Sequence, residues 1–216
     1  MYTVHMDKNK DRLFIIIPGF IEGKIRNIID DETLGAAFII CADSGYDRAK
    51  SESIVPDMIV GDFDSSETVL PEDIPVVTVP SHKDETDFEL ACSIAMENGA
   101  KEVLIPGGFG GRIDHTIGNI QNAAGFFEKG VTITMRDERN SLRVMKEGTL
   151  VIPREDAYLS LLAYSGPAVI SISGVEYPLE RHRITPLHPL GVSNEFTADE
   201  AVVTVHEGTI LVMTAK

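Results

Sequence analysis

Long hydrophobic runs and paired cysteines are both missing from this chain of 216 residues. Its longest apolar stretches, such as 13–17 and 38–42, fall far below the ~18–20 residues that cross a bilayer, and no cationic, apolar and small-residue series opens the chain. The two cysteines, Cys41 and Cys92, form no C-x-x-C motif and sit in apolar runs. This pattern argues against a disulfide framework and a zinc site and predicts buried thiols. We therefore expect a cytoplasmic protein that does not cross a membrane.

Positive charge is also scarce. The chain has 19 Lys and Arg against 34 Asp and Glu, which gives a formal net charge of −15. Non-specific nucleic-acid binding needs cations that neutralise phosphates, so we expect no nucleic-acid partner. Hydrophobic residues make up 43% and charged residues 25%, as in an ordinary globular protein. The acids are concentrated in residues 41–90, where they alternate with apolar runs and so punctuate a folded unit.

The first half of the chain alternates strand-like and helix-like segments. Near-continuous apolar runs bounded by turn residues predict strands buried on both faces at 13–17, 36–41, 58–60, 76–79 and 103–105. Helices are expected at 46–51, at 88–98 and from about 114 to 129. This alternation predicts a mostly parallel α/β sheet.

After Gly130 the pattern changes to strands without helices. The expected strands are 131–135, 142–145, 149–152, 158–163, 168–172, 201–205 and 209–213, separated by turn signals such as 165–167 and 207–208. This spacing predicts an antiparallel sandwich or barrel. We place a domain boundary between residues 130 and 140, with an α/β domain over 1–135 and a β-sandwich domain over 136–216.

Two carboxylates, Asp62 and Asp64, come directly after the expected strand 58–60. In extended chain, side chains at i and i+2 point to the same side. Two carboxylates ~5 Å apart at an effective dielectric of ~20 repel by roughly 3 kcal/mol, which a divalent cation would convert into attraction. Ligands bind at the carboxyl ends of strands in open α/β sheets, which favours a magnesium site over a solvated loop whose acids cap the next helix.

Two further acidic turns have both a functional and a structural interpretation. Asp43 follows the strand 36–41 and either joins the same acidic edge or serves as N-cap of the helix 46–51. In the structural interpretation, Asp84 and Asp87 form a capping box at the start of the helix 88–98. In the functional one, Asp87 and Thr86 face the acidic pocket, and Lys83 binds a phosphate oxygen.

Four glycines occupy the turn 106–111 between a strand and a helix. Glycine lets backbone amides approach a polyphosphate closely, and the helix N-terminus adds positive potential. Arg112 can fork across phosphate oxygens and Asp114 can join a metal shell. His115 either makes a hydrogen bond at the helix start or acts as a base. The turn matches neither the P-loop nor the dinucleotide-binding pattern.

These motifs, taken in order, resemble bacterial thiamine pyrophosphokinases. The segments that carry the resemblance are 42–45, 61–65, 83–87, 110–115 with Asn119, 174–179 and 193–195. The resemblance covers nearly the whole chain and implies an α/β catalytic domain that binds ATP and magnesium, followed by a thiamine-binding β-sandwich. It also implies a homodimer with sites at the subunit interface, and transfer of diphosphate from ATP to the hydroxyl of thiamine with Mg²⁺. The chain differs from the family pattern at Ser44 and in the loop 18–20, where glycines are more usual.

Carried over residue by residue, the resemblance assigns roles to positions of this chain. The catalytic and metal-binding groups would be Asp62, Asp64, Asp87 and Asp114, with Arg112 also catalytic. The ATP-binding groups would be Asp43, Lys83, Thr86, Gly110, Gly111, Arg112 and Asn119. Thiamine would meet Ser193 and Asn194, offered by the partner subunit.

Several alternatives stay open. The same acids and glycines could form a non-catalytic magnesium or nucleotide sensor, a structural protein with solvated acids, or a phosphotransferase acting on another alcohol. The catalytic base is any carboxylate of the acidic edge. Because the chain has no tryptophan, an aromatic partner for thiamine would be Tyr177, Phe196 or His182.

Overall fold

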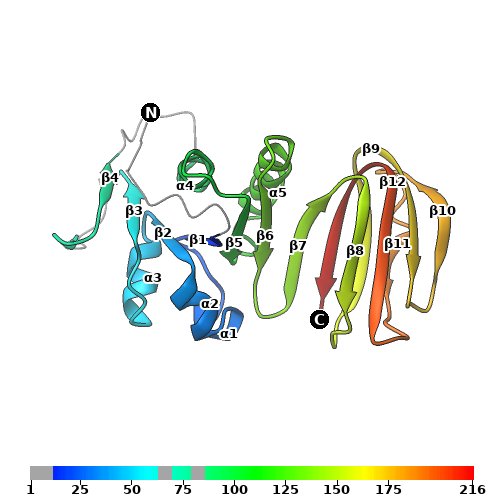
Figure 1. The fold of residues 1–216 in the computed structure, drawn as a ribbon, viewed down its shortest axis with the longest axis horizontal. Coiled ribbons are helices and arrows are strands. Elements are labelled where there is room, and N and C mark those ends of the chain that lie inside the picture. The colour runs from blue at the N-terminus through cyan, green and yellow to red at the C-terminus, as the bar shows by residue number, and fades with distance from the viewer. Residues whose placement is uncertain (1–11, 63–69, 79–85) are drawn as a thin grey trace. The chain divides into compact units, whose positions relative to one another are not determined.

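The computed structural model describes residues 12–62, 70–78 and 86–216, and these form two compact units that divide after Glu138 (Figure 1). None of the helices in these residues is long and apolar enough to span a membrane. The first unit is an α/β unit and the second consists of antiparallel strands, as the fold prediction required.

The described residues of the first unit form a parallel sheet of six strands. In chain order the strands are β1 (Phe14–Ile17), β2 (Phe38–Ala42), β3 (Met58–Gly61), β4 (Val76–Thr78), β5 (Glu102–Pro106) and β6 (Thr132–Arg136). Their order across the sheet is β6-β5-β1-β2-β3-β4, and every neighbouring pair is parallel. Strands β1, β2 and β3 are buried along their whole length, which explains why they appear in the sequence as uninterrupted apolar runs.

Within the described ranges this sheet is accompanied by α1 (Ile25–Ile28), α2 (Asp31–Ala36), α3 (Gly45–Ser51), α4 (Asp87–Glu97) and α5 (Ile113–Glu128). Figure 1 shows α1, α2 and α3 on one face and α4 and α5 on the other. One face of the strands, which includes Ile15, Ile17 and Ile39, forms a core cluster with residues of α1, α2 and α3. The sequence analysis missed α1 and α2 because four and six residues are too few to show a helical period.

The caps of two helices differ from the expected ones. The N-cap of α4 is Thr86, whose hydroxyl accepts a hydrogen bond from the Glu89 N–H at 3.1 Å, so of the two alternatives the one in which Asp84, outside the described residues, caps this helix is wrong. The N-cap of α3 is Ser44, so Asp43 does not cap that helix either.

The second unit has six strands: β7 (Asn140–Met145), β8 (Gly148–Pro153), β9 (Tyr158–Ser173), β10 (Leu179–Ile184), β11 (Gly191–Asn194) and β12 (Glu200–Ala215). The long strands β9 and β12 pair with each other along both of their halves. In one layer, the C-terminal half of β12 also pairs with β7, and the N-terminal half of β9 pairs with β11. In the other layer, the N-terminal half of β12 pairs with β8, and the C-terminal half of β9 pairs with β10. Two four-stranded layers therefore share two bent strands around one apolar core.

The bends replace turns that the sequence predicted. Strands were expected to end at 165–167 and 207–208, but β9 and β12 continue through these points. Gly208 has a φ of 86°, and a Cβ atom there would lie 2.5 Å from the carbonyl oxygen of Pro167, so the two bends cross closely. Strands β10 and β11 were not predicted. The strand at 131–135 was grouped with the antiparallel strands, but β6 runs parallel to β5.

Candidate active site

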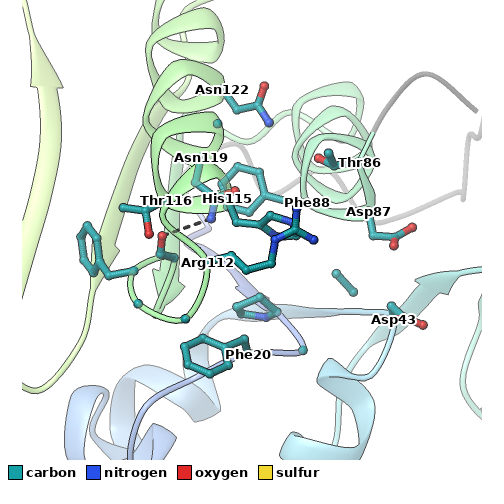
Figure 2. Close-up of a pocket in the computed structure, with 18 of the residues that line it drawn as sticks. Phe20, Asp43, Thr86, Asp87, Phe88, Arg112, His115, Thr116, Asn119 and Asn122 are labelled. Atoms are coloured by element: carbon teal, nitrogen blue, oxygen red, sulfur yellow. Dashed lines mark hydrogen bonds between the residues drawn. The ribbon is translucent and has the colours of Figure 1, made fainter.

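A cavity of about 690 Å³ opens in the first unit, at the carboxyl ends of its strands. Strand β1 has β2 on one side and β5 on the other, so the direction in which strands are added reverses there. Ligands bind in the crevice at such a reversal. The lining, drawn in part in Figure 2, consists of Pro18, Gly19, Phe20, Ala42, Asp43, Ser44, Thr86, Asp87, Phe88, Gly108, Phe109, Gly110, Gly111, Arg112, Asp114, His115, Thr116, Gly118, Asn119 and Asn122.

The loop between β5 and α5 forms one wall of this pocket. Gly107, Gly108, Gly110 and Gly111 all have positive φ, at 109°, 87°, 83° and 61°. A Cβ atom at Gly108 would lie 2.7 Å from the sulfur of Met135, so this position also lacks room for a side chain. The loop leads directly into the 16-residue helix α5. Bare backbone amides followed by a helix N-terminus provide a surface suited to phosphate oxygens.

Arg112 and Asp114 form a two-point ion pair at the edge of the loop. Arg112 Nε donates to Asp114 Oδ1 at 3.1 Å and Nη2 donates to Oδ2 at 2.5 Å. The hydrogen bond from Arg112 lowers the pKa of the Asp114 carboxyl, and the same pairing raises the pKa of Arg112. Both side chains are more than half exposed, so solvent screens the pair and either group can exchange its partner for a ligand.

Two further carboxylates line the cavity, Asp43 and Asp87. Asp43 has a φ of 49°, a region that side-chain-bearing residues rarely occupy, and its N–H donates to the Val60 carbonyl at 2.7 Å. Strain of this kind gathers at functional sites. Asp87 is the first residue of α4 and follows the capping Thr86. Figure 2 shows Asp43 and Asp87 on one side of the pocket, with Arg112 extending into it.

Of the positions assigned from the sequence, eight line this one cavity: Asp43, Thr86, Asp87, Gly110, Gly111, Arg112, Asp114 and Asn119. Asn119 also donates from Nδ2 to the Gly108 carbonyl at 3.1 Å, which ties α5 to the loop. Asp62 follows β3 directly but is not among the lining residues. Asp64 and Lys83 lie outside the described residues.

The sequence analysis missed part of the lining. Thr116 and Asn122 flank Asn119 at intervals of three residues on α5, and this polar spacing was a usable signal. Phe20 lines the pocket from the loop after β1, and a single aromatic residue in a loop gives no pattern from which to find it.

No three His, Cys, Asp or Glu side chains lie close enough to hold a metal ion, as far as the described ranges extend. The pocket nevertheless presents carboxylates from the end of β2, the start of α4 and the start of α5. Oxygen donors are what Mg²⁺ prefers, and it commonly keeps several waters and binds through one or two carboxylates plus phosphate. The donor set therefore suits magnesium brought in with a polyphosphate.

In the second unit, Ser193 and Asn194 close strand β11. Ser193 has a φ of 61°, and its N–H donates to Ser160 Oγ at 3.0 Å. Asn194 is 8% exposed, and its amide bonds the backbone of Tyr177 twice: Nδ2 donates to the Tyr177 carbonyl at 2.9 Å and Oδ1 accepts from the Tyr177 N–H at 3.0 Å. The side chain of Tyr177, in contrast, is exposed. Asn194 thus fixes the backbone that carries this exposed aromatic side chain.

The cysteines are buried, as predicted. Burial raises the pKa of both Cys41 and Cys92 well above the ordinary thiol value. A thiol in that state is a poor nucleophile, so neither cysteine contributes reactivity to the pocket.

Comparison with known proteins links both units to one family. The family model described as "Thiamin pyrophosphokinase, catalytic domain" matches residues 30–135. The model described as "Thiamin pyrophosphokinase, vitamin B1 binding domain" matches residues 142–210. The thiamine pyrophosphokinase of Bacillus subtilis (strain 168) is 29% identical over 182 residues, which cover 81% of this chain and 85% of that protein.

Solved structures show the same relationship. The crystal structure of thiamine pyrophosphokinase from Bacillus subtilis superimposes with a TM-score of 0.79 at 25% identity, covering 95% of this chain and 99% of that one. A thiamin pyrophosphokinase from Geobacillus thermodenitrificans shares the fold with a TM-score of 0.77 at 24% identity, covering 94% and 97% of the two chains. The ordered motifs, the two family models and the shared fold agree, and the chain belongs to the thiamine pyrophosphokinase family.

Proposed function

We propose that this protein transfers the diphosphate group of ATP to the hydroxyl of thiamine, giving thiamine diphosphate and AMP. The observation that carries the proposal is the composition of one cavity in a member of this family. A left-handed glycine loop and Arg112 form one wall, and carboxylates from separate strand and helix ends face it. A phosphate-binding wall opposite an acidic wall is what a reaction between a polyphosphate and a cationic alcohol requires.

The glycine loop and Arg112 would hold the polyphosphate of ATP. Gly110 and Gly111 have no side chains of their own to cover their amides, and α5 begins two residues later. Arg112 would exchange Asp114 for phosphate oxygens, because its fork fits either partner. This exchange would release the Asp114 carboxylate at the moment the nucleotide arrives.

The acidic wall would hold magnesium and the cationic substrate. Magnesium would be bound by Asp62, Asp64, Asp87 and Asp114, and when bound it would neutralise charge on the polyphosphate. Asp43 would add to the negative potential that attracts the fixed positive charge of thiamine.

The protein's own contribution to the reaction would be mainly positioning. The pocket would align the thiamine hydroxyl with the β-phosphorus of ATP. A new O–P bond forms there, the bond between the β-phosphorus and the oxygen bridging to the α-phosphate breaks, and AMP leaves with that oxygen. A carboxylate of the acidic wall accepts the hydroxyl proton, and Arg112 stabilises the charge that develops on the phosphates.

The second unit would supply the thiamine contacts. Ser193 and Asn194 would bind or position thiamine, and the strained φ of Ser193 supports a role for this turn. Tyr177, held by Asn194, would offer its ring to the cationic thiazolium. In this proposal residues 1–135 are the catalytic domain, residues 136–216 are the thiamine-binding domain, and two copies form a cytoplasmic homodimer with sites between subunits.

Conservative substitution of the acids tests the proposal. Asp62→Asn and Asp87→Asn remove one charge each and should lower turnover by a factor of about 100 or more, with little change in melting temperature. Asp73→Asn is the matched control, because Asp73 is an exposed acid outside the cavity lining. Near-normal turnover in both Asp62→Asn and Asp87→Asn would refute the metal assignment. ATP binding without release of AMP by the unaltered protein would identify a nucleotide sensor instead.

A further inference from the structure

The loop after β1 places an aromatic ring at the pocket that the phosphate chemistry does not use. Phe20 lines the cavity and is 55% exposed. Its ring atoms lie 3.3 to 3.8 Å from the positions that Cβ atoms would take at Gly110 and Gly111. The ring therefore packs against the glycine loop while much of its surface stays open (Figure 2). Leaving a large apolar side chain exposed forfeits hydrophobic stabilisation, so the position favours a bound ligand that covers it.

The backbone that carries Phe20 is fixed from two sides. Arg48, from α3, donates through Nη2 to the carbonyls of Ile21 at 3.0 Å and Gly23 at 2.7 Å. On the other side, a Cβ atom at Gly107 would lie 3.2 Å from the Phe20 carbonyl oxygen, so the two loops are in close contact. With this backbone held and the ring packed against the glycine loop, Phe20 should lose little conformational entropy when a ligand stacks on it.

We propose that Phe20 is the stacking platform for the purine base of ATP. This inference rests on the proposed function, because it assumes that the polyphosphate lies on the glycine loop. The ring and the loop are in direct contact, so Phe20 borders the surface that the phosphates would occupy, and the base would lie against its open face.

Two observations favour the base of ATP over the rings of thiamine. Phe20 lies on the side of the pocket away from Asp43 and Asp87, where a cation would be drawn (Figure 2). A neutral base has no such preference and gains from an apolar surface. Of the other phenylalanines in the lining, Phe88 is 8% exposed and Phe109 is half-buried, so Phe20 presents the most open phenyl ring.

The absence of tryptophan from the chain allows a direct test. Phe20→Trp creates a single tryptophan at the proposed platform, which can be excited selectively over the five tyrosines, and Phe127→Trp, at the far end of α5, is the matched control. Each variant is titrated with ATP and with inorganic tripolyphosphate in the presence of magnesium. ATP should quench the tryptophan fluorescence of Phe20→Trp but not that of Phe127→Trp, and tripolyphosphate, which has no base, should bind without quenching.

Phe20→Ala should weaken ATP binding about 10-fold and leave tripolyphosphate binding unchanged, because stacking is the interaction removed.

The outcomes separate the inference from the function on which it rests. Equal ATP affinity in Phe20→Ala and the unaltered protein, or quenching by thiamine but not by ATP, would overturn the platform and leave the function intact. A Phe20→Trp emission that changes with protein concentration, and not with ATP, would show that a second copy covers the ring and would also overturn it. If the unaltered protein bound neither ATP nor tripolyphosphate, the proposed function itself would fail.

Discussion

Replacing Asn194 by alanine tests the link between a buried amide and an exposed aromatic ring. The amide makes two hydrogen bonds to the backbone of Tyr177 and is almost fully buried. Each such bond contributes about 1 kcal/mol, so Asn194→Ala should lower the free energy of unfolding by about 2 kcal/mol. For a protein of this size that corresponds to a melting temperature lower by about 4–8 °C.

Two further variants show whether the hydrogen bonds are responsible. Ser193→Ala removes a hydroxyl next to Asn194 without touching either bond and should change stability by less than about 0.5 kcal/mol. Asn194→Asp keeps an acceptor for the Tyr177 N–H but loses the donor and sets a carboxylate against the Tyr177 carbonyl. It should therefore destabilise the protein at least as much as alanine does.

Urea denaturation, followed by far-ultraviolet circular dichroism, measures these differences as changes in midpoint at constant slope. If Asn194 positions Tyr177 for thiamine, Asn194→Ala should also raise the KM for thiamine more than the KM for ATP. A loss of less than about 0.5 kcal/mol in Asn194→Ala would refute the structural reasoning, because the amide would then not hold the segment.

Three other predictions follow from the first unit. Gly45→Ala would drive a Cβ into the carbonyl of Ile17 and should lower the free energy of unfolding by about 3 kcal/mol or more, measured by thermal unfolding. Gly35→Ala, with open space around it, should stabilise α2 slightly, and equal effects of the two variants would contradict the packing described. Arg112→Gln should raise the pKa of Asp114 toward its ordinary value in a carbon-13 NMR titration. Since the pKa of Asp114 is lowered in the folded protein, the stabilisation from the ion pair is present above the ordinary carboxyl pKa and is lost as pH falls through the lowered value. If Arg112→Gln left the titration of Asp114 unchanged, the ion pair would be ruled out. Magnesium together with ATP should raise the melting temperature and EDTA should cancel the rise; no shift would argue against a metal-nucleotide site.

The parts of the fold that could be predicted are those that local chemistry determines. Buried parallel strands must be apolar on both faces, so β1, β2 and β3 were evident as apolar runs. The glycine loop was evident because four left-handed positions need residues without side chains. Acids after two strands predicted a shared edge; of these, Asp43 lines the cavity, Asp62 is not in its lining, and Asp64 lies outside the described residues.

Features that depend on distant contacts could not be predicted in the same way. A glycine can mark a turn or a bend, and only the pairing of β9 with β12 along both halves shows that Gly166 and Gly208 mark bends. Thr86 and Asp84 are both good helix caps, and the start of α4 at Asp87 decides between them. Phe20 became a site candidate only when the loop after β1 was seen against the glycine loop.

The central claim is that diphosphate, and not a single phosphate, passes from ATP to thiamine. The most direct measurement is to incubate the protein with thiamine, magnesium and ATP labelled at either the α- or the γ-phosphate, and to resolve the products chromatographically with an EDTA control. The account predicts the γ-label in thiamine diphosphate and the α-label in AMP, in equal amounts, with both products absent in EDTA. Formation of ADP and thiamine monophosphate would contradict it, because attack would then occur at the γ-phosphorus.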